Sequence, residues 1–287
     1  MMGTTGNDDD ENAMNLRRLS TIDEYRACVQ LQRDTWGGDF DGIVPLSILK
    51  VSQRIGGVCA GAFDENGALV GFVFGMTGVE KRRIVHWSDM LAVRPGLRDK
   101  GLGVLLKAYQ RELLRPLGVE TVYWTYDPLE AKNAHLNLNK LGAHVHEYVE
   151  NMYGDTGSVL HQGLGTDRFI VAWDIESPRV EEALDGGDGE SPDHLEIDAY
   201  SQTPIVNTRL TDGKPEPTTE YSLPNDSVVR VEVPASIQSE KQAAPDRGER
   251  WRTSTRRAFL HYLSRGYDVR TLYRDEAGRC FYLLDRD

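Results

Sequence analysis

One arginine and two glycines, spaced Arg98-x-x-Gly101-x-Gly103, are the residues of this chain best suited to hold an anion. They follow an apolar stretch typical of a strand and begin the amphipathic pattern of a helix over residues 102–114. A helix N-terminus leaves backbone N–H groups unpaired and carries partial positive charge, and glycines let a phosphate come close to the backbone. Lys100 adds a further positive charge. The segment therefore predicts a phosphate-binding turn.

Two other interpretations of this segment have to be weighed. A glycine-rich turn that binds nothing fits the spacing taken alone. A dinucleotide-binding turn does not fit, because the GxGxxG pattern is absent and the neighbouring strands follow a hairpin pattern instead of alternating with helices.

The elements that must position this turn form a mixed α/β domain, which we expect over residues 14–175. Asp64-Glu65-Asn66-Gly67 is a tight-turn sequence and predicts a hairpin. The expected elements are a strand at 14–19, helices at 21–35 and 45–55, strands at 58–63, 68–76 and 84–93, a helix at 102–114, a strand at 119–126, a helix at 131–141, and strands at 143–153 and 168–175.

The regions outside this domain differ in composition. Residues 1–13 are polar and acidic and predict a disordered tail, whereas residues 176–227 predict a linker or an irregular excursion. Residues 228–287 predict a C-terminal α/β extension of the pattern strand–helix–strand–strand. Its pattern resembles part of the domain before it. We expect it to extend the sheet, to close over the site, or to bind a partner or a second copy.

Composition excludes several classes of protein. The net charge of -12 argues against general nucleic-acid binding, which needs a basic surface. No apolar run reaches the roughly 18 residues that span a membrane, and the N-terminus lacks the pattern of a secretory signal, so we expect a cytoplasmic protein without membrane contact. His144 and His146 alternate on one strand, but no cluster of ligands accompanies them, so no metal is expected.

The segment from Met90 to Gly103 closely resembles the hallmark of the GNAT superfamily of acyl-CoA N-acyltransferases, an Arg/Gln-x-x-Gly-x-Gly/Ala loop after a long fourth strand. The expected order β-αα-βββ-α-β-α-ββ and the segment from Asn133 to Leu141-Gly142-Ala143 resemble that family too. The resemblance implies a central twisted mixed sheet flanked by helices. It also implies acetyl-CoA or another acyl-CoA, succinyl-CoA included, as co-substrate, and a small-molecule amine as acceptor. A homodimer is left open.

The resemblance also assigns residues to coenzyme A. The backbone of the strand end would pair with the pantetheine amides, and the N–H groups of the turn would hold the pyrophosphate. Asn133 would hydrogen-bond the pantetheine, although it could equally be a simple helix-start residue. The residues concerned are Leu91, Ala92, Val93, Arg98, Asp99, Lys100, Gly101, Leu102, Gly103 and Asn133.

A narrower resemblance covers more of the chain. One GNAT subgroup, with a branch associated with the N-succinylation of amino acids, shares several short segments with it. These are Trp36-Gly37, Asp127-Pro128-Leu129, residues 133–137, Tyr153-Gly154, Thr166-Asp167-Arg168, Trp251-Arg252, Thr255-Arg256 and Gly266-Tyr267.

Acyl transfer to an amine needs a base, which we expect on the fourth strand. Asp89 lies nine residues before Arg98, where some members of the superfamily carry a catalytic His. Strict alternation would place Asp89 on one face with Trp87 and Leu91, and His86 on the other. Asp89 is therefore the preferred base, acting directly or through water. A buried structural aspartate is the alternative for Asp89, and His86 is the alternative base.

The proton donor for the leaving thiolate is harder to place. Many members carry a Tyr at the position that Leu138 occupies here, so the usual acid is missing or replaced. Tyr148 is the preferred replacement, with Tyr153, Asn137 and His135 as alternatives. An acyl-CoA-binding module without catalysis remains the alternative function.

A carboxylate on the substrate would need a cationic partner. Arg168, Arg252 and Arg256 are candidates, because the guanidinium fork fits a carboxylate. Surface ion pairs are the alternative role of these three arginines.

Overall fold

The computed structural model describes residues 14–154, 164–186, 200, 202–220 and 222–286. The chain divides into two compact units, one of residues 1–38 and 43–119 and the other of residues 39–42 and 120–287. The expected tail at 1–13 lies outside the described residues. The division near residue 120 falls inside the expected domain of residues 14–175, so it does not test where that domain begins and ends. Those bounds stay a prediction.

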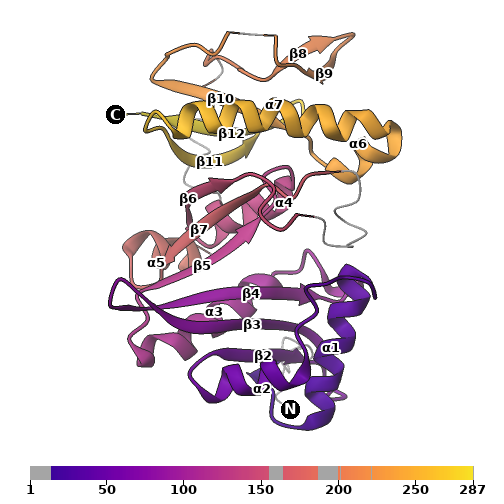
Figure 1. The fold of residues 1–287 in the computed structure, drawn as a ribbon, viewed down its shortest axis with the longest axis vertical. Helices are drawn as coiled ribbons and strands as arrows, with labels where there is room; N and C mark the ends of the chain where they lie inside the picture. The colour runs from indigo at the N-terminus through magenta and orange to yellow at the C-terminus, as the bar shows by residue number, and fades with distance from the viewer. Residues whose placement is uncertain (1–13, 155–163, 187–199, 201, 221, 287) are drawn as a thin grey trace, which may run out of the picture. The chain divides into compact units, whose positions relative to one another are not determined.

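The first unit contains four strands that pair antiparallel in chain order (Figure 1). They are β1 (Asn15–Arg18), β2 (Val58–Phe63), β3 (Leu69–Glu80) and β4 (Arg83–Val93). The predicted hairpin turn between β2 and β3 is confirmed. Its Asp64 carboxylate accepts hydrogen bonds from the N–H groups of Asn66 and Ala68, and Gly67 has a φ of 76°.

Three helices of the first unit contact these strands. They are α1 (Ile22–Trp36), α2 (Leu46–Arg54) and α3 (Leu102–Leu114), and the short turns η1 (Pro95–Leu97) and η2 (Arg115–Leu117) flank α3. Helix α1 begins at a capping box, in which Thr21 and Glu24 each bond the other's backbone N–H. All three helices lie where the sequence predicts them.

The second unit begins with a three-stranded antiparallel arrangement in the order β5-β7-β6. Its strands are β5 (Thr121–Tyr126), β6 (His144–Val149) and β7 (Arg168–Asp174). The helix expected at 131–141 is α4 (Ala131–Ala134), followed by the π-helical turn η3 (His135–Lys140). The element order from β1 to β7 is the one expected for the GNAT superfamily, so the predicted fold class is confirmed.

The described part of the predicted linker is more ordered than its composition indicates. It contains α5 (Pro178–Asp185) and a hairpin of β8 (Thr208–Thr211) and β9 (Lys214–Pro217). Ser177 caps α5, and Asp212-Gly213 turns the hairpin with positive φ at both residues. These short capping and turn signals override the polar composition, so the prediction of an irregular segment is wrong for these residues.

The C-terminal region has the predicted strand–helix–strand–strand pattern, with one extra helix. Its elements are β10 (Val228–Val233), α6 (Ile237–Ala243), α7 (Pro245–Leu263), β11 (Asp268–Arg274) and β12 (Cys280–Asp285). The strands form a separate antiparallel sheet in the order β10-β12-β11. The expectation that this region extends the first sheet is therefore wrong, because its strands pair with one another in a sheet of their own.

Helix α7 lies against the sheet of β10, β12 and β11 (Figure 1), and its Phe259 also contacts β6 and β7. The ring of Phe259 lies 4.7 Å from Phe169 of β7, 5.6 Å from Tyr148 of β6 and 5.4 Å from Tyr282 of β12, measured between centroids. Such edge and tilted pairs of buried rings stabilise packing beyond their apolar area. The C-terminal region is thus part of the core of the second unit.

None of the helices in the described residues is both long enough and apolar enough to span a bilayer.

Candidate functional site

The turn between β4 and α3 has the backbone that an anion needs. Arg98 is extended, Asp99 has a φ of 61°, and Gly101 has a φ of 78° at the start of α3. Only a residue without Cβ adopts the left-handed region freely, so Gly101 is required by the turn. The N-cap residue of α3 is Gly101, which has no side chain to bond the first N–H groups of the helix.

Charge and exposure at this turn also suit a pyrophosphate. Arg98, Asp99 and Lys100 are exposed, whereas Leu102 is 4% exposed and anchors the helix. The Arg98 side chain folds back, and its Nε donates to the carbonyl oxygen of Val93 at 2.9 Å. In sequence, Arg98 and Lys100 supply two positive charges next to the positive end of α3, and Asp99 between them supplies one negative charge. The residues present fit the phosphate groups of coenzyme A.

The strand before the turn is held firmly by β3. Leu91 pairs with Val73, Ala92 with Phe72, and Val93 with Gly71. Ala92 and Val93 are buried, and Leu91 is half-buried. Pairing of their backbone with pantetheine stays a prediction.

Asp89 lies in a β-bulge of β4. Phe74 pairs with Met90 and the next residue, Gly75, with Ser88, so Asp89 is the extra residue of the strand. Ser88 and Leu91 consequently share a face, opposite Trp87. The expectation that Trp87, Asp89 and Leu91 share one face is wrong for Leu91, because the bulge interrupts the alternation.

The surroundings of Asp89 change the pKa of its carboxyl. Loss of hydration among protein atoms raises its pKa above the usual value, and a hydrogen bond with the Trp87 side chain opposes this effect. The residue as a whole is exposed. A raised pKa moves a carboxylate closer to the range useful for a general base.

His86 belongs to a buried polar network against α3. Its Nε2 lies 3.1 Å from Nε2 of Gln110, and its Nδ1 lies 3.0 Å from Oγ1 of Thr77. Lys107, only 4% exposed, donates to Oγ of Ser88 at 2.8 Å. Burial, with the charge of Lys107, lowers the pKa of His86 to about 3, so its ring is neutral. As expected, His86 points away from the face of Asp89.

The predicted acid candidates have different surroundings. Tyr148 donates to Oδ2 of Asp167, and burial raises the pKa of its hydroxyl. Asn137 is buried and accepts from Nε1 of Trp124 at 3.0 Å, and Leu138 is buried as well. Tyr153 is 45% exposed, and its hydroxyl lies 3.0 Å from Oγ1 of Thr125. Tyr153 is therefore more exposed than Tyr148, the other tyrosine considered as the acid.

Two further candidates lie on the helix after β5. Asn133 on α4 is exposed, in accord with either of its expected roles. For His135, loss of hydration lowers the pKa, and the charges of Lys140 and Arg274 act in the same direction. His135 is thus neutral around pH 7.

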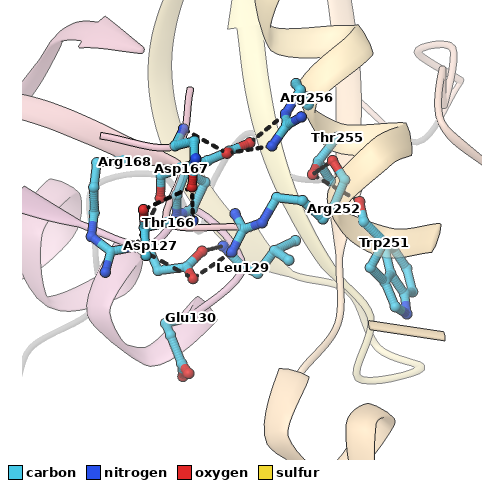
Figure 2. Close-up of polar contacts among 12 residues, drawn as sticks. Asp127, Leu129, Glu130, Thr166, Asp167, Arg168, Trp251, Arg252, Thr255 and Arg256 are labelled. Atoms are coloured by element: carbon cyan, nitrogen blue, oxygen red, sulfur yellow. Dashed lines mark hydrogen bonds and ion pairs between the residues drawn. The ribbon is translucent and has the colours of Figure 1, made fainter. Parts of the chain in front are cut away.

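A buried charge cluster joins β5, β7 and α7 in the second unit (Figure 2). Oδ2 of Asp127 accepts from Nη2 of Arg252 at 2.5 Å and lies 3.7 Å from Nη1 of Arg168. Asp167 accepts from Nε and Nη2 of Arg256 at 2.8 and 2.6 Å. The cluster brings together all three arginines that the sequence singles out for a carboxylate.

The acidity of Asp167 shows how tightly the cluster is bonded. Burial alone would raise the pKa of Asp167. The bonds from Arg256, Tyr148 and the N–H of Asn151 outweigh burial and lower it. Asp167 is therefore ionised at neutral pH, and Tyr148 holds its proton toward it.

Asp127 and Asp167 were named from the sequence only as parts of shared segments, without a role. The signal available was their position, since Asp127 directly follows β5 and Asp167 directly precedes β7. Because β5 and β7 are antiparallel neighbours, those two ends lie at the same edge. The described residues contain no group of three or more His, Cys, Asp or Glu side chains that could hold a metal.

No protein-family model matches the chain, and no curated protein matches its sequence. Among solved structures, it is similar to the ribosomal-protein-S18-alanine N-acetyltransferase from Escherichia coli (18% identity, TM-score 0.43, covering 57% of this chain and 96% of that one). The acetyltransferase of GNAT family from Streptococcus pneumoniae has 17% identity and a TM-score of 0.45, covering 56% and 98%. A chain of the NatC complex bound to Gag peptide and CoA has 12% identity and a TM-score of 0.45, covering 56% and 98%. Each likeness spans little more than half of this chain.

Proposed function

We propose that this chain is an acyl-CoA-dependent N-acyltransferase that moves an acetyl or succinyl group to a small amine, an amino acid among the candidates. The observation that carries the proposal is the turn from Arg98 to Gly103, which has left-handed backbone at Asp99 and Gly101 and leads from a bulged strand into α3. A turn of this geometry supports binding of a pyrophosphate, and the GNAT-type order of elements favours coenzyme A over other phosphates.

The bound thioester supplies the acyl group. Asp89 takes a proton from the amine as the new C–N bond forms at the acyl carbon and the C–S bond breaks. The leaving thiolate takes one proton, for which Tyr148 is the proposed donor and Tyr153 or water the alternative. Donation by Tyr148 has to compete with its hydrogen bond to Asp167. The products are an N-acylated amine and coenzyme A, so atoms and charges balance.

Isothermal calorimetry with coenzyme A, acetyl-CoA and succinyl-CoA tests the first part of the proposal. We expect binding of at least one of them to the full chain. Absence of heat with all three would overturn the proposed function.

Release of free thiol across a panel of amines tests the second part. Turnover with any amine supports catalysis, and Asp89→Asn should slow it while coenzyme A still binds. Binding without turnover on every amine would instead support an acyl-CoA-binding module.

A further inference from the structure

Arg252 is a buried cation with unused hydrogen-bonding capacity. Its residue is 3% exposed, and its Nη2 donates to Asp127. Its Nε and Nη1 are also buried, yet neither has a hydrogen-bond partner among the described residues. Figure 2 shows the Arg252 side chain extending from α7 toward Asp127, with Leu129 nearby.

The two unpaired donors of the Arg252 guanidinium need a hydrogen-bond acceptor. Buried N–H groups normally find a partner, and leaving a charged donor unpaired is costly. Arg252 cannot relieve the cost by losing its proton. Burial alone would lower the pKa of Arg252. The charge of Asp127 and its hydrogen bond outweigh burial, so the pKa of Arg252 is raised. An oxygen that the described side chains do not supply is therefore expected at Nε and Nη1.

The surroundings restrict what that oxygen belongs to. Asp127 and Asp167 are both carboxylates of this cluster, so a group with two negative charges would be repelled from two sides. A single carboxylate carries one negative charge and matches guanidinium geometry. Arg168 lies beside the same Asp127, and its Cζ lies 5.5 Å from the ring of the half-exposed Tyr153. The Asp127 side chain itself is 14% exposed, so solvent reaches this carboxylate of the cluster.

We propose that Arg252, supported by Asp127 and Arg168, binds a carboxylate group of a small substrate. This inference rests on the proposed function, since it names the class of molecule that the transferase takes. The carboxylate belongs either to an amino-acid acceptor or to a dicarboxylic acyl chain such as succinyl. The shared chemistry is one carboxylate on a small flexible molecule.

A direct binding experiment tests the site without any catalysis. The full chain is labelled with ¹⁵N-arginine, and the Nε–H resonance of Arg252 is assigned by its loss in Arg252→Lys. We expect this resonance to shift on titration with alanine, N-acetylalanine or succinamate, each of which carries one carboxylate, but not with the neutral analogue succinamide. No shift with any of the carboxylates, or an equal shift with succinamide, would overturn the proposal and leave an internal water as the acceptor.

A kinetic experiment then distinguishes the two sources of the carboxylate. With acetyl-CoA, alanine is compared with ethylamine, and phenylalanine with 2-phenylethylamine. With the carboxylate-free amines, succinyl-CoA is compared with acetyl-CoA. A preference in kcat/KM for the amino acids indicates the acceptor, and a preference for succinyl-CoA indicates the acyl chain.

The preference should depend on Arg252. Arg252→Lys keeps the charge but moves the donors, so we expect the preference to fall about 10-fold, the effect of losing one hydrogen bond between charged groups. The matched control is Arg265→Lys, an exposed arginine just beyond the same helix, which should leave the preference unchanged. An equal preference in both variants would contradict the proposal.

The two proposals can fail separately. A carboxylate-dependent shift without any binding of acyl-CoA would leave the site standing and remove the transferase function. Transfer to amines with no preference for a carboxylate, and with no shift of the Arg252 resonance, would support the transferase function and remove the carboxylate site. If Arg252→Lys does not fold, as circular dichroism would show, the titration of the wild-type chain still decides, with the resonance then assigned through Arg252→Gln or by sequential assignment.

Discussion

Asp167 gives the sharpest test of how the second unit is held together. Its carboxylate is fully buried and accepts from Arg256, Tyr148 and the N–H of Asn151. Asp167→Asn keeps the size of the side chain but removes its charge and one acceptor. Removing one partner of a buried ion pair costs about 3–5 kcal/mol. Because the Arg256 side chain is 33% exposed, water can solvate part of its guanidinium. We therefore expect a loss of about 2–3 kcal/mol in the free energy of unfolding.

Urea unfolding followed by tryptophan fluorescence measures this loss, since Trp251 is buried on the same helix as Arg256. The matched control is Glu150→Gln, which removes a 48% exposed partner of Arg256 at 3.5 Å. An exposed pair of this kind contributes about 0–1 kcal/mol. If Asp167→Asn costs no more than Glu150→Gln, the cluster does not stabilise the unit and the reasoning is wrong.

The same substitution makes a prediction about pH. The pKa of Asp167 is lowered in the folded chain, so its ionised form is favoured by folding. The resulting stability is fully present above the unfolded pKa of about 3.9 and is lost as the pH falls through the lower folded value. The difference in stability between wild type and Asp167→Asn should thus be constant above about pH 5 and shrink below about pH 4. A difference that grows on acidification would contradict this assignment.

Three further substitutions test the transferase proposal. Asp89→Asn should lower kcat by about 10²–10⁴-fold. The raised pKa of Asp89 predicts that the wild-type rate falls as the pH drops through that value, and a variant with an unchanged profile would reject the base. Gly101→Val should weaken coenzyme A binding by about 10-fold or more in calorimetry, because a β-branched residue resists a φ of 78°. Unaltered affinity would disconnect the turn from the ligand. Tyr148→Phe should lower both stability and rate if Tyr148 is the acid, but stability alone if it only anchors Asp167, with Tyr153→Phe as the comparison.

Local patterns in the sequence predict most of the elements. The tight turn at Asp64–Gly67 and the glycine at 101 each act within a few residues, and each is found where expected. The bulge at Asp89 escaped prediction, because it depends on how β4 pairs with β3. The hairpin at Asp212-Gly213 was missed for a different reason, since its turn signal lies in a polar region that reads as a linker.

The charge cluster lies beyond any local pattern. Asp127 and Arg252 are 125 residues apart, and Asp167 and Arg256 are 89 residues apart. A carboxylate in one segment carries no signal that a particular arginine far along the chain will meet it. That the three arginines bind a substrate carboxylate stays a prediction, and within the chain they lie beside the carboxylates of Asp127 and Asp167.

These contacts define what the C-terminal region does for the second unit. Without α7, Asp127 and Asp167 would lose Arg252 and Arg256, and two carboxylates would face a core with fewer cations. Phe169 would also lose the ring of Phe259 that covers it at 4.7 Å. An uncompensated buried charge and an uncovered aromatic ring both oppose folding. The carboxylates of Asp127 and Asp167, at the ends of β5 and β7, therefore depend on α7 for the arginines that neutralise them. Any ligand that binds Arg252 is likewise bound by a residue of α7 and not of the strands.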